Sequence, residues 1–392
     1  MVLKSNGFQN RDTSPPPRAK PARGKFCNRP HIAPDACLKE LELTVLAYGT
    51  TAASQPLGPM TITRRPPGPR DVQIEIAYCG VCHSDLHQAR AEWAGTLYPC
   101  VPGHEIIGQI SAVGADVSRF AVGETVGVGC MVGSCRNCRS CDDGLEQYCD
   151  HGFIGTYNGR SSEPPGHTLG GYAQRITVDD HFVLKIRHAA DKLPAVAPLL
   201  CAGITTYAPL RRYQAGPGKK IGIVGIGGLG HMGIKLAHAM GAQTVAFTTS
   251  AAKRADAKAL GADEVVVSRN ADEMQAQAGS FDLILNTVAA SHDLDPFIAL
   301  LKRDGTMVMV GVPDQPHPPL NVAGLIFRRR NIAGSLIGGI AETQEMLDFC
   351  AEKGITAEIE MIRIQDIETA FERMKAGDVK YRFVIDNSSL AA

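Results

Sequence analysis

The chain has 392 residues, which is enough for two domains of ordinary size, each with its own core. Hydrophobic residues make up 44% and charged residues 20% of the sequence, a composition typical of a globular protein and not of a disordered one. Lysine plus arginine total 40 and aspartate plus glutamate total 40, so no net charge favours nucleic acid or an anionic membrane as a partner. No apolar run approaches the roughly 20 residues that a membrane span needs, and the first residues lack the pattern of a secretory signal.

The first 42 residues differ from the remainder of the chain. They include three successive prolines at 15–17 and many basic residues, and they lack the apolar periodicity of an element that packs on a core. This pattern predicts a disordered extension over residues 1–42. A transit peptide and a start codon assigned too far upstream are alternatives, although the prolines disfavour the amphipathic helix of a transit peptide.

The pattern from residue 43 to about residue 190 is typical of strands. Four residues spaced two apart alternate with mostly polar neighbours, which is the period of a half-buried strand: Val72, Ile74, Ile76 and Tyr78. Between 106 and 128, short apolar stretches are separated by glycines, which favours short strands joined by turns. We therefore expect a β-rich domain in this part of the chain.

After about residue 190, strands and helices are expected to alternate. Helices are predicted at 232–240, where apolar residues recur at helical spacing, and at 251–260, which is followed by Gly261. The predicted strands cover residues 219–225, 244–247, 265–267, 282–285 and 306–310. This alternation predicts a parallel sheet with helices on both faces.

The strongest chemical signal is a cluster of four closely spaced cysteines: Cys135, Cys138, Cys141 and Cys149. In a chain without a secretory signal, such spacing favours metal binding over disulfides and indicates a reducing compartment, the cytoplasm. Four thiolates can close the tetrahedral shell of a structural zinc. An iron–sulfur cluster is the alternative, but the wider last gap and Asp150 in place of a proline depart from the ferredoxin pattern.

A glycine-rich stretch, Gly225-Ile-Gly227-Gly228-Leu229-Gly230, lies between a predicted strand and a predicted helix. In such a motif the first glycine permits a tight turn, the second lets a pyrophosphate approach the backbone, and the third lets the helix pack close to the strand. The N–H groups at the start of the helix then face the phosphates. The context therefore predicts a dinucleotide-binding site.

The end of the second strand of this domain predicts which dinucleotide binds. A site for NAD normally carries an acidic residue there, but this strand ends in hydroxyl side chains with no carboxylate. Thr249 and Ser250, followed by Lys253 and Arg254, suit a 2′-phosphate, so we expect NADP(H). The alternative is ordinary capping of a helix by the hydroxyls, with two solvated cations.

A third set of candidate residues is dispersed along the chain. Cys82 lies in the segment 79–87, His104 lies between Gly103 and Glu105, and Cys201 begins the segment 201–205. Two cysteines and a histidine leave a fourth position open, which is the composition of a catalytic zinc site. Spacing alone does not bring these three residues together, and singly each also fits a core residue.

From about residue 43 to residue 386, the chain resembles the zinc-containing medium-chain alcohol dehydrogenases. It is most similar to their cinnamyl-alcohol-dehydrogenase-like branch of bacterial NADPH-dependent aldehyde reductases. The matching segments occur in the order typical of the family: 79–87, 103–105, the four cysteines, 200–203, 225–232 and 380–386. The resemblance implies an α/β protein in which a GroES-like, β-rich catalytic domain is split in sequence around a Rossmann domain with a doubly wound parallel sheet. The catalytic domain would comprise residues 43–190, with a zinc lobe near 130–150, and residues 337–392. The Rossmann domain would comprise residues 191–336.

The resemblance also implies two zinc ions per chain. The catalytic ion would be held by Cys82, His104 and Cys201, and the structural ion by the four clustered cysteines. Glu105 would lie beside the catalytic metal, and Asp85 would orient its ligands.

Further roles follow from the same resemblance. Ser84 and His87 would form a proton relay, His83 would contact the pyrophosphate, and Thr205 would lie near the nicotinamide. The neighbouring Cys79 and Cys100 would not bind metal.

We therefore expect a cytoplasmic, homodimeric enzyme that interconverts primary alcohols and aldehydes with NADP(H), acting as a broad-specificity aldehyde reductase. One alternative is a zinc-free quinone or enone reductase on the same fold, which the complete set of zinc ligands disfavours. Another is a non-catalytic protein that binds zinc and a nucleotide and acts on nucleic acid through the cysteine lobe, which the balanced charge disfavours. The sequence leaves the substrate open, since Trp93 fits either a substrate pocket or the core, and 334–340 is only a candidate contact region for a dimer.

Overall fold

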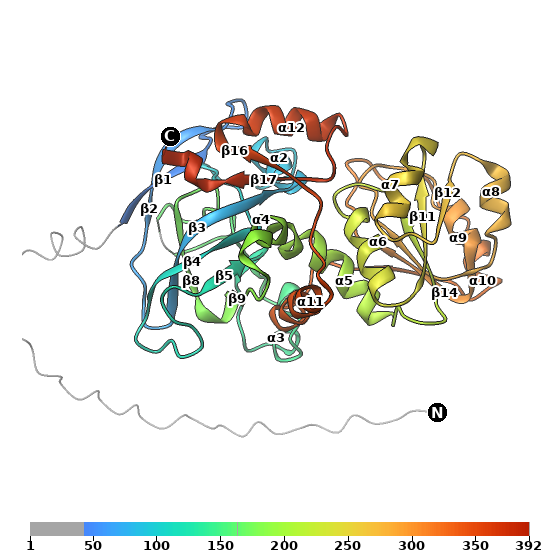
Figure 1. Ribbon diagram of the computed structural model, residues 1–392, viewed down its shortest axis with the longest axis horizontal. Helices are drawn as coiled ribbons and strands as arrows, with labels where there is room; N and C mark the ends of the chain where they lie inside the picture. Colours follow the sequence, from blue (N-terminus) through green and yellow to red (C-terminus); the bar gives the residue numbers. More distant parts are fainter. Residues whose placement is uncertain (1–42, 163, 392) are drawn as a thin grey trace, which may run out of the picture. The chain divides into compact units, whose positions relative to one another are not determined.

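The computed structural model describes residues 43–162 and 164–391, which form two large sheets with their helices (Figure 1). The extension predicted over 1–42 lies outside the described residues. The first sheet is mostly antiparallel and belongs to the β-rich part of the chain. The second sheet is parallel and covered by helices. The predicted combination of a GroES-like domain with a Rossmann-like parallel sheet is confirmed.

The first sheet contains the predicted strand at 72–78, in which Val72, Ile74 and Ile76 are buried. Its strand order is β16-β17-β3-β4-β5-β9, and β8 also pairs with β3. Its strands are β3 (Asp71–Val81), β4 (Ile106–Val113), β5 (Thr125–Val128), β8 (Arg175–Asp179), β9 (Leu184–Lys185), β16 (Ile359–Arg363) and β17 (Arg382–Asp386). Two further antiparallel pairs complete this part: β1 (Leu43–Gly49) with β2 (Gly58–Arg64), and β6 (Met131–Gly133) with β7 (Ile154–Gly155). The last two strands of the chain thus complete a sheet that begins at residue 71.

The second sheet is parallel throughout, with the strand order β12-β11-β10-β13-β14-β15. Its strands are β10 (Lys220–Val224), β11 (Gln243–Thr248), β12 (Glu264–Val267), β13 (Phe281–Asn286), β14 (Leu301–Met309) and β15 (Asn331–Gly334). Its helices are α6 (Gly230–Ala239), α7 (Arg254–Ala259), α8 (Ala271–Ala276), α9 (Asp295–Leu300) and α10 (Val322–Ile326). The reversal of order at β10 and β13 creates a switch point at the carboxyl ends of the strands, where ligands bind in sheets of this kind.

Two predicted elements differ in detail from the structure. The helix predicted at 251–260 is a 3-10 turn, Ala251–Lys253, followed by α7, and Gly261 ends it with a positive φ of 108°. The strand predicted at 306–310 begins five residues earlier, at Leu301. The extra residues form an irregular pairing with β13, with Asp304 in a left-handed conformation at φ 67°. Such irregularities break the simple alternation that sequence patterns detect.

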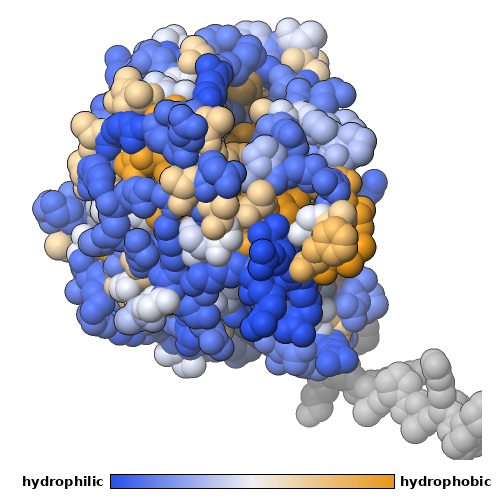
Figure 2. Space-filling view, turned by 90° about the vertical axis from the view of Figure 1, so that its right-hand side faces the viewer, coloured by the Kyte–Doolittle hydropathy of each residue, from blue (hydrophilic) through white to orange (hydrophobic). Residues whose placement is uncertain are grey.

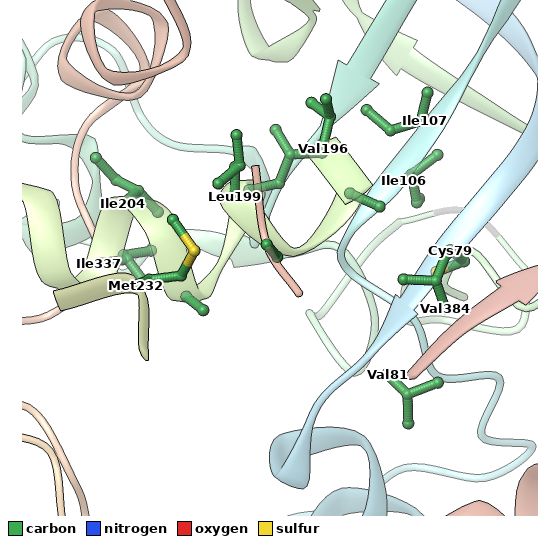
Figure 3. Close-up of a cluster of buried hydrophobic side chains, with 14 of the residues drawn as sticks. Cys79, Val81, Ile106, Ile107, Val196, Leu199, Ile204, Met232, Ile337 and Val384 are labelled. Atoms are coloured by element: carbon green, nitrogen blue, oxygen red, sulfur yellow. The ribbon is translucent and has the colours of Figure 1, made fainter. Parts of the chain in front are cut away.

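Short helices connect the two sheets. They are α4 (Leu193–Val196), the 3-10 helix Ala197–Leu200 and α5 (Ala202–Arg212) on the way out, and α11 (Ile340–Lys353) and α12 (Ile367–Lys375) on the return. Figure 3 shows that the apolar core continues along this connection, from Ile106 in β4 through Leu199 to Ile204, Met232 and Ile337. In the described part of the chain, no single helix is long and apolar enough to cross a membrane. The bent pair Ala190–Leu200 and Ala202–Arg212, at 65°, passes that test together by length and composition only.

Candidate active site and metal centres

Three distant segments meet at one point. Cys82 follows β3 and precedes α2 (His83–Ala89), His104 and Glu105 immediately precede β4, and Cys201 precedes α5. Their potential ligand atoms all lie within 4.8 Å of one another. The structure therefore brings together the three residues that spacing alone could not assemble.

The geometry of this set fits a zinc ion. The Sγ atoms of Cys82 and Cys201 are 4.0 Å apart, and a tetrahedral ion with Zn–S bonds of about 2.3 Å requires an S–S separation of about 3.8 Å. His104 directs Nδ1 to Asp85, 3.1 Å away, which leaves Nε2 as the ligand atom. Contact with the Cys201 thiol lowers the pKa of Cys82, and contact with the Cys130 and Cys82 thiols raises the pKa of Cys201.

Asp85 is fully buried and holds the ligand set in place. Besides His104, its carboxylate accepts hydrogen bonds from the backbone N–H of Cys82 at 2.8 Å, the backbone N–H of Gly103 at 3.1 Å and the Tyr172 hydroxyl at 3.1 Å. It therefore orients two of the three candidate ligands from one side chain. Such outer partners fix the ring orientation of a metal-binding histidine.

Glu105 forms a buried ion pair with Arg382 of β17. Burial raises the pKa of Glu105 to about 7, against the lowering effect of the guanidinium. Among the described residues, Glu105 Oε2 has no hydrogen-bond partner, and it lies so close to Gly80 that a Cβ atom there would stand 1.9 Å from it. Residue 80 must therefore be glycine for this carboxylate to fit.

Arg382 also touches the glycine-rich turn, because a Cβ atom on Gly228 would lie 3.0 Å from its Nη1. Burial lowers and the charge of Glu105 raises the pKa of Arg382, with a net upward shift, so the side chain stays charged. It joins the candidate metal-binding set to the glycine-rich turn. This role of Arg382 was not predicted from the sequence, although Arg382 stands in the segment 380–386 that carried the resemblance.

Ser84 and His87 lie on α2, next to Cys82. The Ser84 Oγ is 3.6 Å from Cys82 Sγ. The His87 Nδ1 is 2.5 Å from Glu92 Oε2, and its ring stacks on Trp93 with centroids 5.2 Å apart. Trp93 is 38% exposed, so it belongs to the surface beside His87 and not to the core.

The glycine-rich turn has the predicted form. Gly225 adopts a φ of 93°, and a Cβ atom on Gly230 would stand 1.9 Å from the Gly225 carbonyl oxygen. A Cβ atom on Gly227 would meet nothing within 4 Å, so the backbone there is open to a ligand. Leu229 is the N-cap residue of α6.

Two other predicted coenzyme contacts lie close to the candidate metal site. Thr205 is buried on α5, and its N–H donates to the Cys201 carbonyl at 3.0 Å. His83 follows Cys82, and desolvation lowers its pKa.

The four residues at the end of β11 differ in their surroundings. Thr249 and Ser250 are exposed, and the Lys253 Nζ donates to the Ile226 carbonyl of the glycine-rich turn at 3.4 Å. Arg254 instead donates to both carboxylate oxygens of Glu273, at 2.7 and 2.8 Å. The ammonium group of Lys253 is thus the cation nearer to the turn.

The four clustered cysteines also come together, with all four Sγ atoms within 4.8 Å of one another. Two of the separations are 3.9 Å, for Cys135 to Cys141, and 4.0 Å, for Cys138 to Cys149. These values again match a tetrahedral zinc. A hydrogen bond from the Asp150 N–H, followed by one from Cys141, lowers the pKa of Cys138 to about 6, which favours a thiolate there.

Within the described ranges, only these two groups have the donors and spacing of a metal site. Cys79 and Cys100 are buried and belong to neither group.

Comparison with known proteins agrees with this geometry. The family described as the alcohol dehydrogenase GroES-like domain matches residues 68–188, and the family described as zinc-binding dehydrogenase matches residues 228–352. Aldehyde reductase YahK of Escherichia coli is 69% identical over 89% of this chain and 99% of its own length. NADP-dependent alcohol dehydrogenase C 1 of Mycolicibacterium smegmatis is 51% identical over 88% of this chain and 99% of its own length.

Solved structures are similar over most of the chain. A cinnamyl alcohol dehydrogenase from Sorghum bicolor has a TM-score of 0.84 and 42% identity, over 88% of this chain and 98% of that one. The cinnamyl alcohol dehydrogenase (CAD) from Helicobacter pylori, complexed with NADP(H), has a TM-score of 0.82 and 38% identity, over 89% of this chain and 99% of that one.

Proposed function

Because this chain belongs to the zinc-dependent medium-chain alcohol dehydrogenase family, we propose that it interconverts primary alcohols and aldehydes with NADP(H), as a broad-specificity aldehyde reductase. The observation that carries this proposal is the meeting of Cys82, His104 and Cys201, next to which Arg382 pairs with Glu105 and also lies against Gly228 of the glycine-rich turn. The names of the relatives agree with this activity. The same likeness supports a division into a catalytic domain, 43–190 and 337–392, and a nucleotide-binding domain, 191–336.

The chain's own residues have defined tasks in this chemistry. Zinc at the Cys82, His104 and Cys201 set supplies a Lewis acid for the substrate oxygen, and the nicotinamide coenzyme supplies or accepts the hydride. Asp85 fixes two of the ligands, and the glycine-rich turn receives the pyrophosphate. The Nη1 of Arg382 brings a positive charge to the same turn, and its Nη2 forms the ion pair with Glu105.

We further propose that Ser84 and His87 move the proton between the substrate oxygen and solvent. Ser84 lies beside the metal-binding Cys82, and His87 lies one helical turn further out, paired with Glu92. The link between the two would run through coenzyme ribose or water. His83, which directly follows Cys82, would contact the pyrophosphate, and Thr205, whose N–H donates to the Cys201 carbonyl, would contact the nicotinamide.

Replacing Ser84 with alanine should lower kcat by about a hundredfold or more while both zinc ions remain bound, because the relay loses its inner hydroxyl. His87→Ala should lower kcat less, since water can replace the outer group. Ser84→Thr, which keeps a hydroxyl, is the matched control and should retain most of the activity. Steady-state kinetics with metal analysis decides, and loss of the catalytic zinc from the Ser84→Ala variant would contradict the assignment.

A homodimer is also proposed, with the face around α10 as its interface. Apolar residues are exposed there: Val312 at 70%, Val322 at 57%, Ile326 at 69% and Phe327 at 83%. Figure 2 shows apolar side chains gathered at one side of this face. The adjacent β15 is an edge strand that pairs only with β14 among the described strands, and an open edge favours pairing with a second copy.

Phe327→Asp should halve the mass measured by sedimentation, because it places a charge in the proposed interface. Val122→Asp is the control, since Val122 is also exposed, at 62%, but lies in the loop between β4 and β5. A parent protein that is monomeric at micromolar concentration would contradict the dimer.

The proposed activity is tested with a panel of aliphatic and aromatic aldehydes and both coenzymes. We expect reduction of several aldehydes with NADPH, weaker activity with NADH, and loss of activity on chelation. An activity on quinones or enones that survives chelation would favour the zinc-free alternative. Fractionation of the source cells would test the proposed cytoplasmic location.

A further inference from the structure

The segment that links β15 to α11, residues 335–339, brings the chain back from the parallel sheet, and we call it the crossover. Its last residue, Gly339, is the N-cap residue of α11 and has no side chain that could cap the helix. Two of its neighbours come instead from the four-cysteine lobe, residues 130–150. The crossover is thus held by a distant part of the chain.

Glu146 is the first of these neighbours. Its Oε2 accepts a hydrogen bond from the Ile340 N–H at 3.1 Å, across 194 residues of sequence. Its Oε1 lies 3.0 Å from His181 Nε2, which belongs to the β-rich part of the chain. Burial raises the pKa of Glu146, but the bond from His181 and the backbone N–H groups lower it below its usual value, so the carboxylate is charged at neutral pH. A negative charge at the first turn of the 14-residue α11 is stabilising.

Tyr148 is the second neighbour, and its hydroxyl accepts a hydrogen bond from the Leu336 N–H at 2.9 Å. The fit is close, since a Cβ atom on Gly339 would stand 1.8 Å from the Gly144 carbonyl oxygen. Glu146 and Tyr148 begin and end the 3-10 helix that directly precedes the metal-binding Cys149. Their positions therefore depend on the same turn that presents a ligand to the metal.

The crossover also leads to the catalytic set. Ile337 lies in the same core as Ile204 and Met232 (Figure 3). The following α11 is tied to α5 by the Tyr207 hydroxyl, which donates to Glu345 at 2.9 Å, and α5 begins directly after Cys201.

From these contacts we propose that the four-cysteine lobe anchors the crossover through the positioning residues Glu146 and Tyr148. The metal of this lobe then determines how firmly the nucleotide-binding part is held against the catalytic part, at the residues that face the coenzyme. A looser crossover leaves more motion to be lost when the coenzyme bridges the two parts, which weakens binding. The inference rests on the proposed coenzyme site.

Hydrogen exchange and NADPH affinity test this proposal in the full-length, zinc-loaded protein. Glu146→Gln keeps the volume but removes the charge, and Tyr148→Phe removes only the hydroxyl. We expect amide exchange over 336–343 to accelerate about tenfold and the Kd for NADPH to rise about three- to tenfold for Glu146→Gln, with smaller changes for Tyr148→Phe. Asp143→Asn is the matched control, because Asp143 pairs with Arg139 within the lobe, and it should change neither quantity.

Parent-like exchange over 336–343 and a parent-like Kd in Tyr148→Phe and Glu146→Gln would overturn the proposal, and Tyr148→Phe alone decides if Glu146→Gln does not fold. Loss of the lobe metal in Cys138→Ser should accelerate exchange over 336–343 as well as within the lobe, and unchanged exchange over 336–343 would overturn the role of the metal. Exchange and NADPH binding remain measurable whatever the substrate is, so failure of the proposed activity would be seen separately.

Discussion

Cys82→Ser is expected to lower kcat/KM for aldehyde reduction by at least about a thousandfold, because Lewis-acid stabilisation by a metal contributes several kcal/mol to such reactions. Serine cannot supply the thiolate that stands 4.0 Å from Cys201 Sγ. Metal analysis should then find one zinc per chain in place of two. The fold should persist, since the Asp85 carboxylate still accepts the backbone N–H of residue 82.

Cys79→Ala provides the matched control for this variant. Cys79 is also buried, three residues earlier on β3, but its thiol faces the Gly80 carbonyl and not the metal-binding set. It should keep two zinc ions and nearly full turnover, with a modest loss of stability from the small cavity. A Cys82→Ser protein with two zinc ions and parent-like turnover would refute the catalytic assignment.

Lys253→Ala should raise the KM for NADPH about tenfold or more and leave that for NADH nearly unchanged, because a hydrogen bond to a charged group contributes roughly 1.5–3 kcal/mol. The Lys253 ammonium group lies near the glycine-rich turn, whereas Arg254 is bound to Glu273. Arg254→Ala should therefore have the smaller effect, and the double variant the largest. The salt dependence of NADPH binding should weaken in parallel, since the lost interaction is Coulombic.

Lys258→Ala is the control for the coenzyme variants, because Lys258 lies on the same helix but its Nζ contacts the Asp263 carbonyl. It should leave both KM values unchanged. Steady-state kinetics with both coenzymes gives the answer. A parent that prefers NADH, or a Lys253→Ala variant that loses both coenzymes equally, would show that the end of β11 does not select the coenzyme.

The metal lobe and the glycine-rich turn could be predicted from the sequence because their residues are close together along the chain. The four cysteines span 15 residues, and the turn spans six. Local spacing therefore carries most of their geometry. The alternation of strands and helices was equally local. It differs from the structure where β14 is irregular and where a 3-10 turn precedes α7, and it did not include the edge strand β15 (Asn331–Gly334).

The residues that complete the candidate active site could not be placed in this way. Cys82 and Cys201 are 119 residues apart, and Glu105 and Arg382 are 277 residues apart. Only a resemblance indicated the first pair, and nothing indicated the second. The ion pair of Arg254 with Glu273 could not be predicted either, because it depends on how α8 packs and not on the end of β11. Tertiary contacts decide these cases, and sequence patterns do not contain them.

The pairing of β17 with β3 has a consequence for how the protein is made. During synthesis, β3 is complete more than 300 residues before β17 leaves the ribosome, whereas the six strands of the parallel sheet all lie between residues 220 and 334. The parallel sheet can therefore close first, as domains fold when their residues become available. One edge of β3 waits for the last strand of the chain, and such an edge can pair wrongly while it is open. Because Arg382 arrives with that strand, the buried ion pair between Glu105 and Arg382 forms only when translation is almost finished. A nascent chain that stalls before residue 382 would hold the six cysteines and the one histidine that are proposed to bind zinc, but it would lack a completed active site.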